Sequence, residues 1–185
     1  MHSTNRTLAW RVALATVFLL GGALSVGARP EASRPARPRL AKAALPAPPP
    51  WPRPTGTLMR IHAAGLQAGR AEGTVLHIHQ HLDVFYNGRR VVVPAGIGLG
   101  AGFYSEVHTH TTSGEIHVES PVVRTFTLGE FFTEWGVPLK GARVYVNGRK
   151  APDPQAVVLR DKEEIAVVFG KPPAILPRVY PGYRL

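Results

Sequence analysis

The chain has 185 residues with a hydrophobic content of 44%, which is enough for one folded domain with a core. Its formal net charge is +10, but residues 1–54 hold eight Lys or Arg against one Glu and so account for +7 of it. The basic character therefore belongs mainly to the N-terminal tail, and no nucleic-acid-binding motif supports a nucleic-acid partner. The absence of cysteine excludes disulfides, thiolate zinc sites and cysteine nucleophiles, and two methionines are too few for a methionine-rich Cu(I) site.

The N-terminal segment has the order of an export signal. Residues 12–28 (VALATVFLLGGALSVGA) form an uncharged apolar run behind Arg6 and Arg11, and Val26 and Ala28 match the small-residue pattern of a cleavage site. We therefore expect residues 1–28 to be a signal peptide or an N-terminal membrane anchor. The rest of the chain should then be extracytoplasmic: secreted, periplasmic or membrane-anchored.

Residues 29–54 are predicted to form a basic, proline-rich linker. This stretch contains nine of the eighteen prolines, which cannot donate backbone hydrogen bonds and favour an extended chain. It could serve as a spacer alone, or as a basic strip attracted to anionic lipid that adds to membrane association.

The remaining residues, 55–185, are predicted to form a single histidine-rich α+β domain. The stretch LHIHQHLDVFYNGRRVVVPAG indicates two strands around an Asn87-Gly88 turn, and SEVHTH with EIHVES indicates a second hairpin around residues 111–114. In TFTLGEFFTEWG, Thr127 and Glu130 form a capping box for a helix over 128–135. The stretches ARVYVNGRK and EEIAVVFG indicate the last strands.

These elements predict a mostly antiparallel or mixed β-sheet with one main helix. The stretch VYVNGRKAPDPQAVVLRDKEEIAVVFG is similar to the last part of a sulfur-carrier protein, which implies a β-grasp-like fold with an inserted histidine-bearing β-hairpin. The carrier function is not implied, because the chain ends in PGYRL in place of a Gly-Gly tail. The pattern HIHQHLDVFYNG, HTHTTSGEIHVES and FTLGEFFTEWGV also resembles a family of exported prokaryotic histidine-rich domains, which implies an exported location and assigns no activity.

Histidines at alternate positions of a strand share one face of the sheet. In the first predicted strand these are His77, His79 and His81, followed by Asp83 on the same face, while Gln80 is a polar exception on the apolar face. His77 and His81 would lie about 13 Å apart along the strand, so one ion is not expected to bind all three histidines.

The second hairpin separates polar from apolar residues when it is paired across its four-residue loop. This register places His108 opposite His117 and puts Val107 and Val118 together on the other face, whereas a slip of one residue would mix the two sets. Directly opposed Cβ atoms lie about 4.5–5.5 Å apart, so both imidazoles could reach one ion. A His-x-His pair on one strand together with a third histidine from the neighbouring strand makes a three-nitrogen site of the kind that carbonic anhydrases and cupins have.

The sequence therefore predicts a site for a divalent transition metal, copper or zinc. The candidate ligands are His77, His79, His81, His108, His110 and His117. We expect His79, His108 and His117 nearest one ion and the others around it, although two sites or a transiently held ion would also account for so many histidines. Asp83 and Glu119 are candidates to accept a hydrogen bond from a ligand imidazole, and Glu119 is the candidate general base.

The remaining histidines and several carboxylates are not expected to take part in the metal site. His2 lies in the predicted signal region and His62 has no patterned neighbours, so neither is expected to be a ligand. The carboxylates of Glu130, Glu134, Glu163 and Glu164 are expected to be solvated or to cap helices.

Three functions remain open from the sequence. The leading hypothesis is an exported metal-binding domain for metal handling. The second is a zinc-hydroxide-type metalloenzyme, a hydratase or hydrolase with three histidine ligands and Glu119. The third is an interaction module without metal whose histidines sense pH. The sequence leaves the oligomeric state open.

Overall fold

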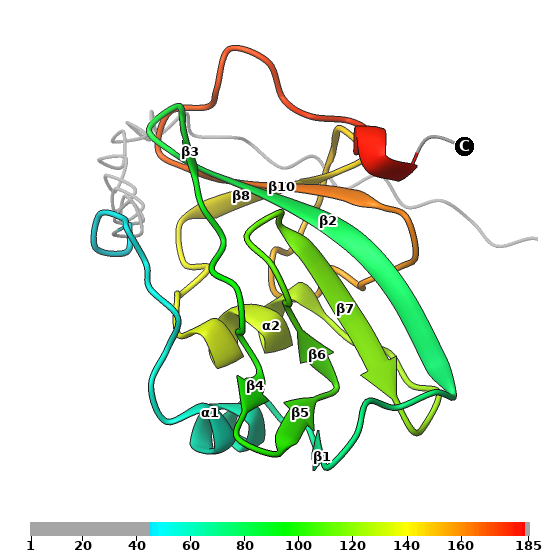
Figure 1. Ribbon diagram of the computed structural model, residues 1–185. Helices are drawn as coiled ribbons and strands as arrows, with labels where there is room; N and C mark the ends of the chain where they lie inside the picture. The colour runs from blue at the N-terminus through cyan, green and yellow to red at the C-terminus, as the bar shows by residue number, and fades with distance from the viewer. Residues whose placement is uncertain (1–44, 184–185) are drawn as a thin grey trace, which may run out of the picture. The chain divides into compact units, whose positions relative to one another are not determined.

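The computed structural model describes residues 45–183 (Figure 1). The predicted signal peptide or anchor, His2 and most of the predicted linker lie outside these residues. In chain order the elements are α1 (Thr57–Ala63), β1 (Ala68–Gly69), β2 (Leu76–Tyr86), β3 (Arg89–Val91), β4 (Leu99–Gly100), β5 (Phe103–Ser105), β6 (Val107–His108), β7 (Glu115–Ser120), α2 (Leu128–Trp135), β8 (Ala142–Val146), β9 (Arg149–Lys150), β10 (Glu164–Phe169) and the 3-10 turn η1 (Pro181–Tyr183).

The long strand β2 organises the main sheet (Figure 1). Its second half pairs in parallel with β10, which pairs antiparallel with β8, and β8 continues into β9. On its other edge β2 pairs with β3 and, through its first half, with β7 and then β6. The order β3-β2-β10-β8-β9 with a parallel central pair is that of a β-grasp, and β6–β7 is the inserted histidine hairpin. The predicted α+β fold with a mixed sheet is thus confirmed.

Both predicted Asn-Gly turns close hairpins. Asn87 and Gly88 have φ angles of 49° and 84°, and the second turn repeats this with Asn147 at 50° and Gly148 at 79°. Positive φ at both central residues matches the right-handed twist of the strands, which explains why Asn-Gly favours this turn. The first turn fixes Tyr86 opposite Arg89 in β2 and β3, and the second fixes Val146 opposite Arg149 in β8 and β9.

Helix α2 is the predicted main helix. The Thr127 side chain accepts a hydrogen bond from the Glu130 backbone N–H, and the Glu130 side chain accepts one from the Thr127 backbone, as the capping box requires. Gly136 ends the helix in the left-handed conformation. Phe131 and Phe132 are buried and belong to the same hydrophobic core as the inward residues of the sheet.

The fold begins before residue 55, where the sequence suggested the domain boundary. Trp51 is only 9% exposed, and its ring makes edge-to-face contacts with Tyr86, Trp135 and Phe169. Its indole N–H donates a hydrogen bond to the carbonyl of Ala47. The proline-rich composition masked this anchor, so the C-terminal end of the predicted linker is part of the packed unit.

Two further features were not predicted. Helix α1 buries Ile61 completely, and the short strands β1, β5 and β4 form a separate small sheet. Strands of two or three residues carry too little alternation to be recognised from sequence.

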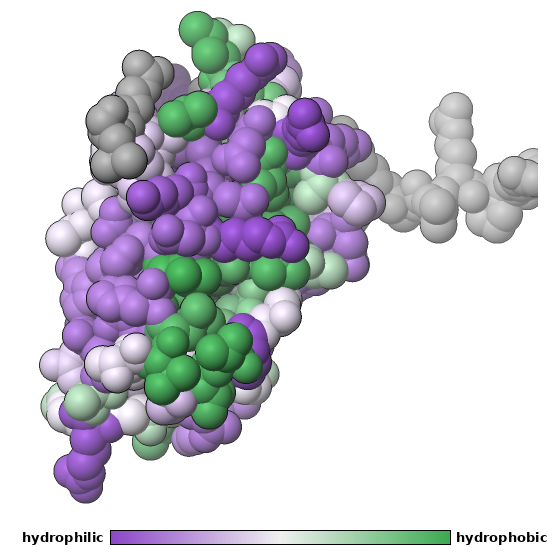
Figure 2. Space-filling view, turned by 90° about the vertical axis from the view of Figure 1, so that its right-hand side faces the viewer, coloured by the Kyte–Doolittle hydropathy of each residue, from purple (hydrophilic) through white to green (hydrophobic). Residues whose placement is uncertain are grey.

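The surface of the described residues is mixed. Figure 2 shows one face on which hydrophilic residues predominate, with hydrophobic residues gathered in its lower middle part and again at its top. Among residues 45–183, no helix has the length and apolar content needed to cross a membrane.

Candidate metal centre

The candidate site lies on the part of the sheet formed by β2, β7 and β6, with β7 in the middle. The registers place His79 opposite His117 and His117 opposite His108, so that His117 has a histidine on each side. Glu119 lies opposite His77 in the same way. The cross-strand pair of His108 and His117 predicted from the sequence is confirmed.

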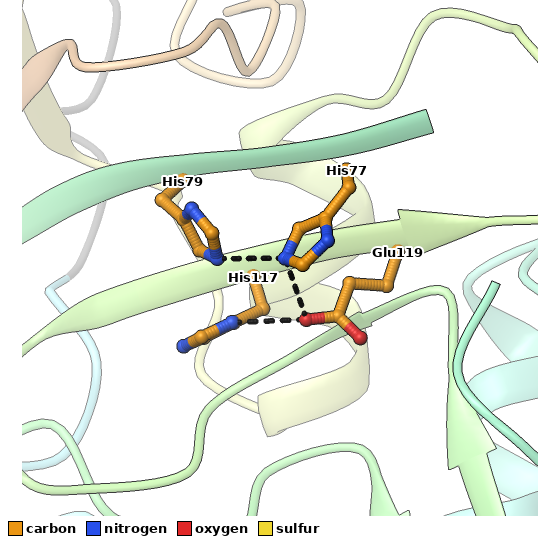
Figure 3. A group of neighbouring side chains, drawn as sticks. All are labelled: His77, His79, His117 and Glu119. Atoms are coloured by element: carbon orange, nitrogen blue, oxygen red, sulfur yellow. Dashed lines mark hydrogen bonds and ion pairs between the residues drawn. The ribbon is translucent and has the colours of Figure 1, made fainter. Parts of the chain in front are cut away.

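The first group of converging side chains, called set A, consists of His77 and His79 from β2 and His117 and Glu119 from β7 (Figure 3). The two Nε2 atoms of His77 and His79 are 3.0 Å apart, and Glu119 Oε1 lies 3.2 Å from His77 Nε2 and 3.1 Å from His117 Nδ1. Two nitrogens that bind one ion at about 2.0–2.1 Å lie about 3 Å from each other. Set A therefore has the dimensions of a metal site.

The second group, set B, consists of His108 and His110 with the same His117 and Glu119. The Nε2 atoms of His108 and His110 are also 3.0 Å apart, and the ring of His110 lies 4.6 Å from that of His117 between centroids. Each His-x-His pair thus brings two Nε2 atoms together on its own side of β7.

The environment holds the ring of His108 in the form that binds metal. His108 is fully buried, and its Nδ1 donates a hydrogen bond to the Ser105 carbonyl at 2.9 Å, which leaves the Nε2 lone pair for a ligand. Burial lowers the pKa of His108 to about 4, and burial also lowers the pKa of His117. Both imidazoles are therefore neutral near pH 7, as metal binding requires.

Glu119 is the carboxylate that belongs to both sets. Burial alone would raise its pKa, but the neighbouring His108 and His117 outweigh burial and lower it. The carboxylate is thus ionised at neutral pH, where it can accept the His117 N–H, as predicted, or bind an ion directly.

Two carboxylates at the site were not among the predicted site residues. Glu72 Oε1 lies 3.4 Å from His110 Nε2 and 3.8 Å from His108 Nε2, next to set B. Glu115 Oε1 lies 3.3 Å from His117 Nε2. Glu115 is two residues from His117 in the same strand, so the alternation of the sequence already predicts that it lies on this face. Glu72 comes from a loop that has no periodic pattern.

His81 is placed apart from sets A and B. Its Nδ1 lies 2.7 Å from Glu164 Oε2 and its Nε2 lies 3.0 Å from the Ser113 carbonyl oxygen, and the ring of Tyr180 stacks on it at 3.8 Å. His81, Asp83 and Glu164 are close enough to form a third possible metal group. Both nitrogens of His81, however, already have protein partners.

Asp83 forms an ion pair with Arg90, and the described residues include no histidine that donates a hydrogen bond to it. Its expected role toward a ligand imidazole is therefore not seen in the structure.

Two of the carboxylates expected to be solvated or to cap helices are fully enclosed. Glu164 is 1% exposed beside His81, and Glu134 is completely buried without a well-formed hydrogen bond to either oxygen. The helical pattern of α2 did not predict the burial of Glu134, because the loop before β4 covers this side of the helix as well. Glu130 caps α2 as expected. The exposed His62 on α1 belongs to none of the possible metal groups among the described residues.

A cavity of about 340 Å³ adjoins the site. Its walls include Glu72, Tyr104, Glu106 and Glu119. Glu106 is held by the Ser120 hydroxyl and by Arg124, so Glu72 and Glu119 are the wall carboxylates that also reach the histidines.

Comparisons of the chain with protein-family models, with curated proteins and with solved structures found no match. The resemblance to exported histidine-rich domains therefore stays a prediction.

Proposed function

We propose that the chain is an extracytoplasmic metal-binding domain that holds a divalent transition metal, copper or zinc, and acts in metal handling. The observation that carries the proposal is the convergence of two His-x-His pairs on His117 and Glu119, with ligand atoms of each set within 4.8 Å of one another. In each set a pair of histidines with Nε2 atoms 3.0 Å apart is joined by the same third histidine and the same carboxylate, which gives four converging ligand atoms.

The ligand chemistry supports these two ions. Neutral imidazole suits Cu(II) and Zn(II), while a site for Mg²⁺ or Ca²⁺ would be built mainly from oxygen atoms. The exposure of the site to solvent supports a role in metal handling. The side chains of His77 and His110 are 53% and 37% exposed, so an ion could enter or leave past them.

A metalloenzyme is the second candidate, and the adjoining cavity favours it. A small substrate there would lie beside Glu72 and Glu119, either of which could accept a proton from a water near the ion. Tight metal binding without hydratase or hydrolase turnover would favour handling, and turnover lost in Glu72→Gln while metal binding persists would favour catalysis.

The metal site is tested by titrating Cu(II) and Zn(II) into the untagged full chain after removal of metal with a chelator. His117→Ala removes the ligand that both sets share and should weaken binding by at least about 10–100-fold. His62→Ala is the matched control and should bind like the wild type. Equal affinity in all three proteins, or no binding in any of them, would contradict the proposal.

Acid should release the metal, because protonated imidazole cannot bind it. Burial lowers the pKa of His108 to about 4, so this ligand stays neutral well below the ordinary histidine value of about 6.5, and burial also lowers the pKa of His117. We expect the affinity for the metal to decrease progressively as the pH is lowered and to be lost near pH 4. This titration belongs to the same experiment, and binding unchanged between neutral pH and about pH 4 would argue against histidine ligands.

The extracytoplasmic location is part of the proposal and is supported by the sequence of residues 1–28. A reporter that is active only outside the cytoplasm, fused after Ala44, should be active, and deletion of residues 12–28 should abolish its activity. A full-length fusion that is made but shows no reporter activity would refute the location.

A further inference from the structure

We propose that the histidine face holds two ions side by side, one in set A and one in set B, with Glu119 and His117 shared between them; His117 releases its ring N–H proton to solvent when the second ion binds and, as an imidazolate, binds one ion through each ring nitrogen. This inference rests on the proposed metal binding and deepens it. It replaces the single ion near His79, His108 and His117 that the sequence suggested.

Strand spacing is the first argument. His79 on β2 and His108 on β6 are separated by β7, and strands that are two apart in a sheet lie about 9–10 Å from each other. A single ion with bonds of about 2.0–2.1 Å would have to draw both side chains inward over His117. Among the described residues, no set of converging ligands contains both His79 and His108.

The same arrangement of two histidines is repeated on the two sides of β7. The Nε2 atoms of His77 and His79 are 3.0 Å apart on one side of β7, and those of His108 and His110 are 3.0 Å apart on the other. Each pair offers two nitrogens at ligand separation. Each needs only His117 and Glu119 to reach four ligands.

Charge is the third argument. Two divalent ions bring a charge of +4 into a partly buried region, where their repulsion is weakly screened. Glu119 lies between the sets, Glu72 lies beside set B, and Glu115 lies 3.3 Å from His117 Nε2. These three carboxylates offset most of the charge of two ions, whereas a single ion would leave an excess of negative charge.

The experiment measures metal stoichiometry on the untagged full chain, by elemental analysis after saturation with Zn(II) and removal of free metal. The wild type should retain two ions per chain. His79→Ala removes a ligand of set A alone and His110→Ala removes a ligand of set B alone, so each should retain one ion. His62→Ala should retain two. Both site histidines are at least partly exposed, so neither substitution is expected to prevent folding.

Loading with Cu(II) adds an independent measurement. Two Cu(II) ions that share ligands are magnetically coupled, and the electron paramagnetic resonance spectrum of the wild type should show that coupling. The coupling should be absent from both single variants, which should give the signal of an isolated ion.

The possible outcomes separate the two proposals. One ion in the wild type, with weaker binding in both variants, would overturn the two-ion arrangement and leave the metal-binding function standing. Two ions without coupling would overturn the shared ligands. No retained ion in any protein would refute the metal-binding function itself.

Discussion

Glu134→Gln is expected to stabilise the domain relative to the wild type by an amount that grows by about 3 kcal/mol between pH 5 and pH 8. Glu134 is completely buried in α2, and burial raises its pKa to about 8, while the nearby Ser105 hydroxyl opposes this rise only in part. A Cβ atom at Gly98 would lie 3.0 Å from Glu134 Oε1, which shows how closely the loop before β4 covers the carboxyl group.

The sign follows from proton uptake. The unfolded chain ionises Glu134 above about pH 4.5, while the folded chain keeps it protonated until about pH 8. Folding at pH 7 therefore takes up a proton. The free-energy cost of protonating Glu134 on folding grows with pH between about 4.5 and 8 and is constant above about pH 8. Glutamine has no proton to gain, so the difference between variant and wild type should follow this curve.

Urea unfolding of both proteins at pH 5, 6, 7 and 8, with a chelator present, measures this difference. The histidines titrate in both proteins, so their contribution cancels in the comparison. The amide has its own cost of burial, but that cost shifts the curve without changing its slope. A difference that is flat across the four pH values would show that Glu134 is ionised in the folded protein.

The part of the site that could be predicted from the sequence depends on strand periodicity. Alternation placed the histidines on one face, and the separation of Val107 and Val118 from the polar residues fixed the hairpin register that pairs His108 with His117. The helix could be predicted for a similar reason, because Thr127 and Glu130 cap it within a few residues of chain.

The part that could not be predicted depends on contacts distant in sequence. Glu72 reaches the histidines from an irregular loop, and Trp51 enters the core from a proline-rich segment. The placement of β6 and β2 on opposite sides of β7 also could not be read from either hairpin alone. That placement decides whether His79 and His108 face one ion or two.

His81→Ala is expected to destabilise the domain by about 3–5 kcal/mol, because it leaves the Glu164 carboxylate buried without its partner. His81 and Glu164 are 2% and 1% exposed, and their side chains meet at 2.7 Å. Burial by itself lowers the pKa of His81, but the hydrogen bond and charge of Glu164 outweigh it and raise that pKa. The C-terminal segment adds to the enclosure, since Tyr180 stacks on His81 and Tyr183 donates a hydrogen bond to Glu115.

Urea unfolding of His81→Ala, Glu164→Ala and the double variant separates this structural role from metal binding. If the two side chains stabilise each other, the double variant should lose less free energy of unfolding than the sum of the single variants, because it leaves no unpaired buried charge. The number of Zn(II) ions retained at saturation should be the same in His81→Ala as in the wild type. A lost ion together with a stability change below about 1 kcal/mol would instead assign His81 to a metal site with Asp83 and Glu164. The interpretation of His81 as a buried partner of Glu164 would then be wrong.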